Sequence, residues 1–288
     1  MPTFKITLAY DGSEFVGWQR QATGVSIQGL IEKALADLDG APVAVAGAGR
    51  TDAGVHALGQ VASFSLVRAI DGKSVVRAVN ATLPSSIRVL AADIVPSTFH
   101  ARFAARSKTY RYRMFTGEVL DPFERAYVWH VPAPLDVAAM GRAARQLEGT
   151  HDFAAFQAAG GPQRNTEREV FVSRITNPTK PSTMEATGHP EEKIERDRDS
   201  GESNLRGLRP VRGGELTTYE ITGNGFLRHM VRTIVGSLVE IGRGRRDERW
   251  LGCVIASRDR REAGPTAPAA GLFLVGVHYD ADALAAEP

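Results

Sequence analysis

One aspartate, Asp52, lies in a glycine-rich stretch that also carries Arg50 and His56. The stretch reads Ala46-Gly47-Ala48-Gly49-Arg50-Thr51-Asp52-Ala53-Gly54-Val55-His56-Ala57. Apolar runs before and after it are typical of strands, so the sequence predicts that the carboxylate lies on a turn between two strands. Glycines permit backbone conformations that bulky residues resist, and they let a ligand approach the main chain. A carboxylate beside a cation on such a turn suits a nucleophile or a base.

Cations alternate with aromatic rings in a second stretch, residues 99–113. On a strand, Tyr110 and Tyr112 share one face, and Arg111 and Arg113 share the other. Positive charge suits phosphates and flat rings suit unstacked bases, so the pattern favours a surface that binds RNA. An edge strand with a solvated basic face has the same composition, and the residues alone leave both interpretations open.

A third group of basic residues lies nearer the end of the chain. Arg228 and Arg232 are four residues apart, so they share one face of the helix expected over residues 226–241. The later arginines fit a solvated helix end better than a binding site. The whole group consists of Arg228, His229, Arg232, Arg243, Arg245, Arg246 and Arg249.

Length and composition describe an ordinary globular protein. The 288 residues suffice for one large domain or two of usual size, and the net charge of +2 excludes an indiscriminate polycation. The single cysteine, Cys253, cannot form an internal disulfide, and we expect it to pack inertly on an apolar helix face. No signal peptide is evident, and no apolar run approaches the ~20 residues of a membrane span. We therefore expect a cytoplasmic protein.

Hydrophobic periodicity predicts the order strand, helix, strand, strand, helix, strand in the first part of the chain. Ser26 is the expected cap of the first helix. This order is that of a ferredoxin-like unit. The strands are expected at residues 3–10, 43–47, 60–66 and 87–95, and the helices at 26–38 and 73–83.

The second part of the chain is expected to repeat a similar order of strands and helices. Its strands are expected at residues 108–115, 170–176, 215–222 and 272–279, and its helices at 136–147, 226–241 and 248–256. We therefore predict an α+β protein of two ferredoxin-like halves, residues 1–106 and 107–288. The halves are expected to join in a mostly antiparallel central sheet with helices on one face and an active-site cleft between them. Residues 177–212 have few large apolar groups, and we expect a flexible insertion there.

Several other kinds of site lack support. Asp52 occupies the place where a dinucleotide fingerprint needs its third glycine, and no Walker-type lysine motif or nucleophile elbow is present. The histidines are scattered and no cysteine lies near Asp52, so no metal site is expected. Two other functions stay open. One is an RNA-binding module without catalysis, and the other is a glycoside hydrolase, which would need a second carboxylate beside Asp52.

Short motifs of distinctive composition follow one another across nearly the whole chain. They are Phe15-Val16-Gly17-Trp18-Gln19-Arg20-Gln21, Gly49-Arg50-Thr51-Asp52-Ala53-Gly54-Val55-His56-Ala57, Phe99-His100-Ala101-Arg102-Phe103, Tyr110-Arg111-Tyr112, His151-Asp152-Phe153, Phe226-Leu227-Arg228-His229-Met230-Val231-Arg232 and Thr266-Ala267-Pro268. Taken together and in this order, they resemble the tRNA pseudouridine synthase A family. The match at residues 160–164 is weaker, because Gly160-Gly161-Pro162 departs from the pattern expected there.

The resemblance implies isomerisation of uridine to pseudouridine at positions 38, 39 and 40 in the tRNA anticodon stem-loop. It implies a homodimer without a cofactor and Asp52 as the catalytic aspartate, with the first bond that Asp52 makes or breaks left open. It also implies that Tyr110 contacts the target uridine, that Arg50 displaces or holds the flipped base, and that Arg232 is the basic partner of Asp52. The residues implied to contact tRNA are Phe99, His100, Ala101, Arg102, Phe103, Gly160, Gly161, Pro162, Gln163 and Arg164.

Overall fold

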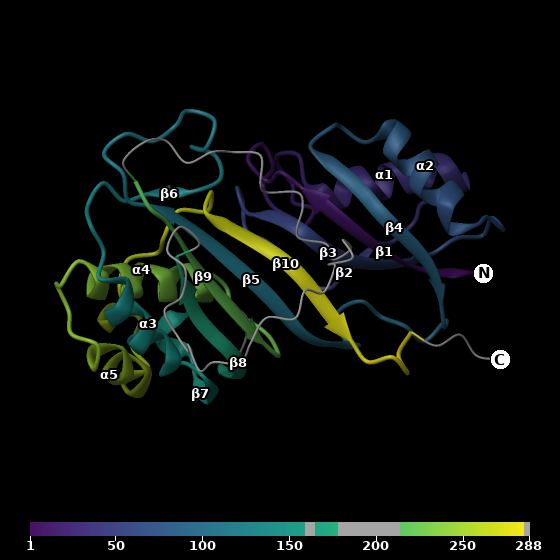
Figure 1. Cartoon of the computed structure of the whole chain (residues 1–288). Coiled ribbons are helices and arrows are strands. Elements are labelled where there is room, and N and C mark those ends of the chain that lie inside the picture. Colours follow the sequence, from purple (N-terminus) through teal and green to yellow (C-terminus); the bar gives the residue numbers. More distant parts are fainter. Residues whose placement is uncertain (159–164, 178–213, 285–288) are drawn as a thin grey trace, which may run out of the picture.

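The protein has an α+β fold built on one central sheet (Figure 1). The computed structural model describes residues 1–158, 165–177 and 214–284. Within these ranges the strands are β1 (Thr3–Tyr10), β2 (Ala46–Gly47), β3 (His56–Ser65), β4 (Ile87–Val95), β5 (Ala105–Phe115), β6 (Trp129–His130), β7 (Gly149–Asp152), β8 (Glu167–Thr176), β9 (Leu216–Gly223) and β10 (Leu272–Tyr279). The α-helices there are α1 (Ile27–Asp39), α2 (Gly72–Thr82), α3 (Val137–Arg145), α4 (Met230–Gly242) and α5 (Trp250–Ser257).

The sheet is open, mixed and largely antiparallel. Its strands follow the order β4-β1-β3-β10-β5-β9-β8-β7, with β2 beside β3 and β6 beside β5. Only two pairings between described strands are parallel, β3 with β10 and β5 with β6. Strand β10, from the end of the chain, pairs with β3 only at His56 and Ala57. This short pairing joins β1, β2, β3 and β4 to the other strands of the sheet.

One row of paired residues crosses the middle of the sheet. Tyr10 pairs with Ala57, Ala57 with Leu274, Leu274 with Tyr110, and Tyr110 with Ile221. Directly paired residues point to the same face of a sheet, so all five side chains lie on one face. All five are buried.

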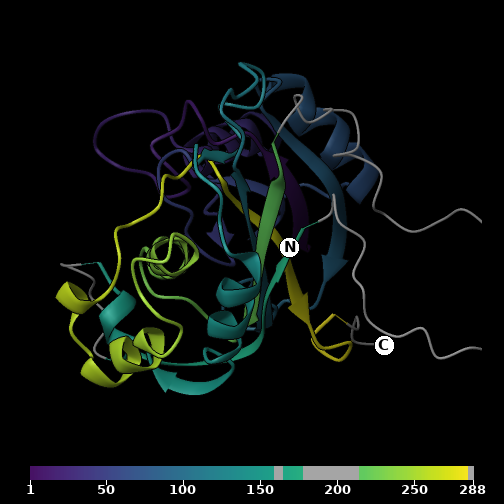
Figure 2. The ribbon, with the colours of Figure 1, turned by 60° about the vertical axis from the view of Figure 1, so that its left-hand side comes forward.

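The helices cover that same face. A single core cluster contains Ile31 of α1, Val79 of α2, Met140 of α3 and Ile234 of α4 together with the inward side chains of the sheet. Figures 1 and 2 show α1 and α2 beside β1 and β4, and α3, α4 and α5 grouped at the other end. The centre of the sheet therefore lies between two groups of helices.

Several sequence predictions are confirmed. Strands β4 and β10 occupy the expected ranges, and α1 begins directly after Ser26. The Ser26 hydroxyl accepts a hydrogen bond from the Gly29 amide at 3.3 Å, as a helix cap does. The expected strand at 60–66 is longer at its start, because it includes His56 and Ala57. The division into two ferredoxin-like halves stays a prediction.

Three sequence predictions need correction. The helix expected over 226–241 begins at Met230, because His229 has a φ of 62° and a left-handed residue cannot belong to an α-helix. Strand β2 is only two residues long, whereas a strand over 43–47 is expected. Cys253 is exposed rather than packed, since α5 turns its neighbours Leu251 and Val254 inward instead.

Two further sequence predictions concern residues 160–164 and 177–212, and the absence of a membrane span. Most of the insertion expected at 177–212 lies outside the described residues, as do residues 160–164. Among the described helices, none is long and apolar enough to cross a membrane.

Candidate active site

The segment between β2 and β3 carries Asp52 on a tight turn. The Val55 amide donates to the Asp52 carbonyl at 3.1 Å, which closes the turn. Gly54 follows with a φ of 75°, and a Cβ there would lie 3.2 Å from the Cβ of Ala269. Both its conformation and its close neighbour favour glycine at this position. The glycine-rich composition therefore serves the backbone of this turn.

A second loop holds the turn from the side. The Trp18 amide donates to the Thr51 carbonyl at 3.1 Å. Gly17 has a φ of 104°, and a Cβ there would lie 2.6 Å from the same Thr51 oxygen. The buried Trp18 ring lies against Gly47 in β2, where a Cβ would come within 2.5 Å of the ring. The loop and the start of the turn thus fit each other without space for larger residues.

A buried hydrogen-bond network lies behind the turn. The hydroxyls of Tyr10 and Thr51 are 2.8 Å apart, and the Gln60 amide donates to the Tyr10 oxygen at 3.3 Å and to the Gly49 carbonyl at 3.0 Å. Burial raises the pKa of Tyr10 to about 12, so its hydroxyl stays protonated at neutral pH. Strands β1 and β3 therefore position the residues on either side of Arg50.

The Asp52 carboxylate faces two side chains from the start of α4. Arg232 Nη1 lies 3.4 Å and His229 Nε2 3.5 Å from the same oxygen, Oδ2. The Asp52 side chain is 30% exposed and that of Arg232 is 15% exposed. Within the part of the chain that the structure describes, Oδ1 of Asp52 accepts no hydrogen bond. One carboxylate oxygen is thus held while the other is open to a ligand.

Arg232 is oriented by the segment that precedes β10. Its Nε donates to the Ala267 carbonyl at 2.7 Å, and the Ala267 amide donates to the Arg232 carbonyl at 3.0 Å. The segment packs so closely on α4 that a Cβ at Gly236 would lie 1.7 Å from the Pro265 oxygen. The motif Thr266-Ala267-Pro268 therefore fixes the guanidinium that faces Asp52.

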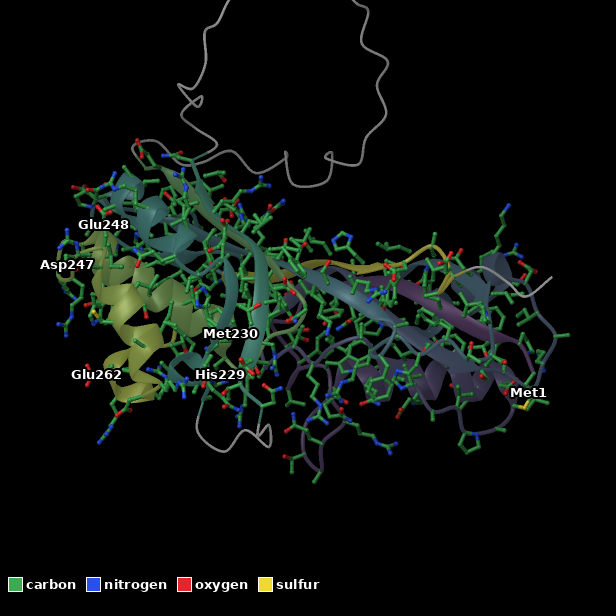
Figure 3. All side chains as sticks on the ribbon, turned by 90° about the horizontal axis from the view of Figure 1, so that it is seen from below. Met1, His229, Met230, Asp247, Glu248 and Glu262 are labelled. Carbon is green, nitrogen blue, oxygen red and sulfur yellow. The ribbon has the colours of Figure 1, made fainter. Side chains whose placement is uncertain are left out.

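The sequence predicts no role for His229 beyond its membership of the basic group near the end of the chain. His229 precedes α4 in a left-handed conformation, and its imidazole reaches Asp52 Oδ2; Figure 3 labels it next to Met230, the first residue of α4. Burial lowers the pKa of His229, the nearby Asp52 charge opposes this, and Arg232 adds to the lowering. The signal in the sequence is its place in the basic group, three residues before Arg232. Helical spacing could not place its side chain, because His229 lies outside the helix.

Tyr110 lies on the helix-covered face beside this group. Its ring packs edge-on against Phe226, with centroids 5.1 Å apart and an interplanar angle of 80°. Burial raises the pKa of Tyr110, with contributions from Tyr10 and Asp52, so the phenol is neutral. Arg50, in contrast, is exposed on the turn and has no ion pair to a described residue.

Residues 99–103 divide into buried and exposed members. Phe99 packs against Tyr279 at 5.2 Å, and Ala101 is buried. Phe103 is 77% exposed, and the Arg102 guanidinium lies 5.7 Å from its ring centroid. His100, Arg102 and Phe103 therefore form the surface part of this segment, held by the buried pair.

His56 closes the Asp52 turn but points to the opposite face of the sheet, because it pairs with Phe273 rather than with the Tyr110 row. Its Nδ1 accepts from the Gly12 amide at 3.1 Å, and its Nε2 lies 2.9 Å from the Ala126 carbonyl. Burial lowers the pKa of His56 despite the nearby Asp11. The role of His56 is thus to anchor the end of the turn.

Comparison with known proteins identifies the family. A family model described as tRNA pseudouridine synthase matches residues 6–104 and 143–280, most of the chain. The chain belongs to this family. The two matched ranges of the tRNA pseudouridine synthase model contain both Asp52 and Arg232, and the unmatched range between them contains Tyr110.

Several relatives match this chain over nearly its full length. The chain is 42% identical over 281 residues to the tRNA pseudouridine synthase A of Moorella thermoacetica, covering 97% of this chain and 100% of that protein. It is 44% identical over 281 residues to that of Solibacter usitatus and 40% identical over 283 residues to that of Lacticaseibacillus casei, with the same coverage. As a tRNA pseudouridine synthase, the protein is an isomerase that modifies tRNA.

Proposed function

We propose that Asp52 is the essential catalytic carboxylate and that the enzyme acts on uridines 38, 39 and 40 of the tRNA anticodon stem-loop. One observation carries the assignment of Asp52. Arg232 and His229 both approach its Oδ2, at 3.4 and 3.5 Å, and no described residue donates to Oδ1. A carboxylate that is fixed through one oxygen presents the other to a substrate in a defined direction.

The reaction needs little more than such a carboxylate. It breaks the N1–C1′ bond of uridine, turns the base and joins C5 to C1′, while C5 loses a proton and N1 gains one. Nothing is oxidised or reduced, and no other molecule is consumed. Oδ1 of Asp52 attacks C1′ or C6, or removes the 2′ proton, and each route starts from the ionised carboxylate beside Arg232.

We further propose that the active-site cleft lies between two ferredoxin-like halves, residues 1–106 and 107–288. Asp52 comes from the first half, whereas Tyr110, His229 and Arg232 come from the second. A uridine within the stem must leave its stack, which costs a few kcal/mol. In this proposal the exposed Arg50 enters the space that the flipped base leaves, and Tyr110 contacts the base.

The RNA surface continues from the site over the segment at 99–103. There Arg102 offers charge for a phosphate, and the exposed ring of Phe103 and the nearby imidazole of His100 offer flat surfaces. The resemblance to the family also leads us to propose a cytoplasmic homodimer.

The test compares D52N with the wild-type enzyme on unmodified tRNA. Asparagine keeps the shape of the side chain but cannot act as a nucleophile or base, so turnover should be lost while tRNA binding is retained. The readouts are tritium release from 5-tritiated uridine and mapping of pseudouridine in the tRNA. D37N, at an exposed position of α1, is the matched control and should behave as wild type.

Two outcomes would count against the proposal. Substantial pseudouridine formation by folded D52N would exclude Asp52 as the essential group. Pseudouridine outside positions 38–40 in the wild-type product would exclude the proposed target. An RNA-binding module without catalysis would bind the tRNA and leave its uridines unchanged.

A further inference from the structure

A lysine that the proposed mechanism does not use lies directly beside the Asp52 turn. Lys108 precedes Tyr110 by two residues on β5, so both side chains are on the helix-covered face. A Cβ at Gly49 would lie 3.5 Å from Lys108 Nζ, so the ammonium rests against the residue before Arg50. The residues paired with Lys108 on the neighbouring strands, Gly223 and Val277, carry no charge.

Two arginines from neighbouring segments act on the Lys108 ammonium. Arg102 approaches from the segment at 99–103 and Arg168 from β8, and both interact with the ammonium unfavourably. Arg168 also lies near Gly225 and donates to the main-chain carbonyls of Asn165 and Glu167. Within the described residues, Lys108 forms no hydrogen bond or ion pair with a carboxylate.

Such a group of cations favours an anionic ligand. A half-buried ammonium without a counter-charge lowers stability, and two further cations increase that cost. An anion at this point would offset the charge of the Lys108 ammonium. In the proposed function Arg50 and Tyr110 handle the flipped nucleotide, which carries a phosphodiester on each side. Lys108 lies two residues from Tyr110 and against the residue before Arg50.

We propose that Lys108 binds a phosphodiester of the tRNA next to the target nucleotide, with Arg102 and Arg168 supplying the surrounding positive field. The identity of the RNA rests on the proposed function. The competing explanation is that the Lys108 stem merely covers Val277 and Gly49 while its ammonium reaches water.

Phosphate binding by Lys108 would make the affinity for tRNA depend on pH, whereas a lysine with a purely structural role would not. Burial, together with Arg102 and Arg168, lowers the pKa of Lys108 to about 8. A bound phosphate stabilises the charged form, so binding takes up a proton wherever free Lys108 is neutral. The charged fraction of a group with a pKa of about 8 falls about tenfold between pH 7 and pH 9, and tRNA affinity should fall by the same factor.

The experiment measures tRNA binding by D52N, K108R/D52N, K108M/D52N and K33M/D52N at constant ionic strength. Arginine keeps its charge over this range, so the affinity of D52N should fall about tenfold more than that of K108R/D52N between pH 7 and pH 9. K108M/D52N should bind more weakly at pH 7, and its log–log salt slope should be shallower by about 0.7 to 0.9. Lys33 is exposed on α1, so K33M/D52N should match D52N.

Two results would overturn the Lys108 site. One is a K108M/D52N protein that keeps the affinity and salt slope of D52N at pH 7. The other is the same pH dependence in D52N and K108R/D52N. Pseudouridine mapping with the wild-type enzyme reports on the proposed function separately, so tRNA that binds with the expected linkage but is modified elsewhere would leave Lys108 assigned and the target site wrong.

Discussion

Arg232 contacts both Ala267 and Asp52. Variants that lose one or both contacts test whether Asp52 needs the position of the guanidinium or only its positive charge. Its Nε donates to the Ala267 carbonyl at 2.7 Å, and its Nη1 lies 3.4 Å from Asp52 Oδ2. In R232K one ammonium cannot reach both partners with the geometry of the guanidinium. In R232M the stem still packs, but both contacts are lost.

The magnitude follows from those two contacts. A hydrogen bond to a charged group contributes about 1.5 to 3 kcal/mol, and the 3.4 Å contact belongs at the lower end. Losing about 1.5 kcal/mol of transition-state stabilisation lowers the rate of the chemical step by about tenfold. We therefore expect about a tenfold loss in R232K and about a hundredfold loss in R232M.

The assay is single-turnover tritium release at saturating enzyme, with thermal unfolding measured for each variant. R245M is the matched control, because Arg245 is also an arginine paired with a carboxylate, Glu240, but is exposed and remote from Asp52. A folded R232M with a rate within twofold of wild type would refute the reasoning. Wild-type activity in R232K alone would show that charge suffices and that the Ala267 contact is not needed.

The remaining predictions concern stability. Y10F removes the hydroxyl that bonds Thr51 and Gln60, so the free energy of unfolding should fall by about 1 to 2 kcal/mol in denaturant titrations, and an unchanged value would contradict a role for this network. His56 and His229 have lowered pKa values, so the unfolded chain binds protons more readily than the folded one below their usual 6.5. The free energy of unfolding should therefore fall as pH falls from 7 to 5. H229N, which tolerates the left-handed backbone, should reduce this dependence, and an unaltered dependence would mean that His229 does not contribute.

Much of the secondary structure could be predicted from local patterns. The cap at Ser26, the apolar stripe of α1 and the alternation in β1, β4 and β10 each depend on residues only a few positions apart. The start of α4 and the two-residue strands could not be predicted in this way. His229 takes a left-handed conformation that its residue type permits but does not require, and strands as short as β6 show no period.

The sequence by itself determined that Asp52 lies on a glycine-rich turn, since the turn and its flanking strands are encoded within twenty residues. Only the tertiary structure decided what faces Asp52. Arg232 is 180 residues away along the chain, and His229 reaches the same oxygen only because α4 begins where it does. The arrangement of Lys108 against Gly49 likewise depends on the register of β5 and the path of the turn. Such contacts arise from how distant strands and helices pack, and no local pattern of residues specifies that packing.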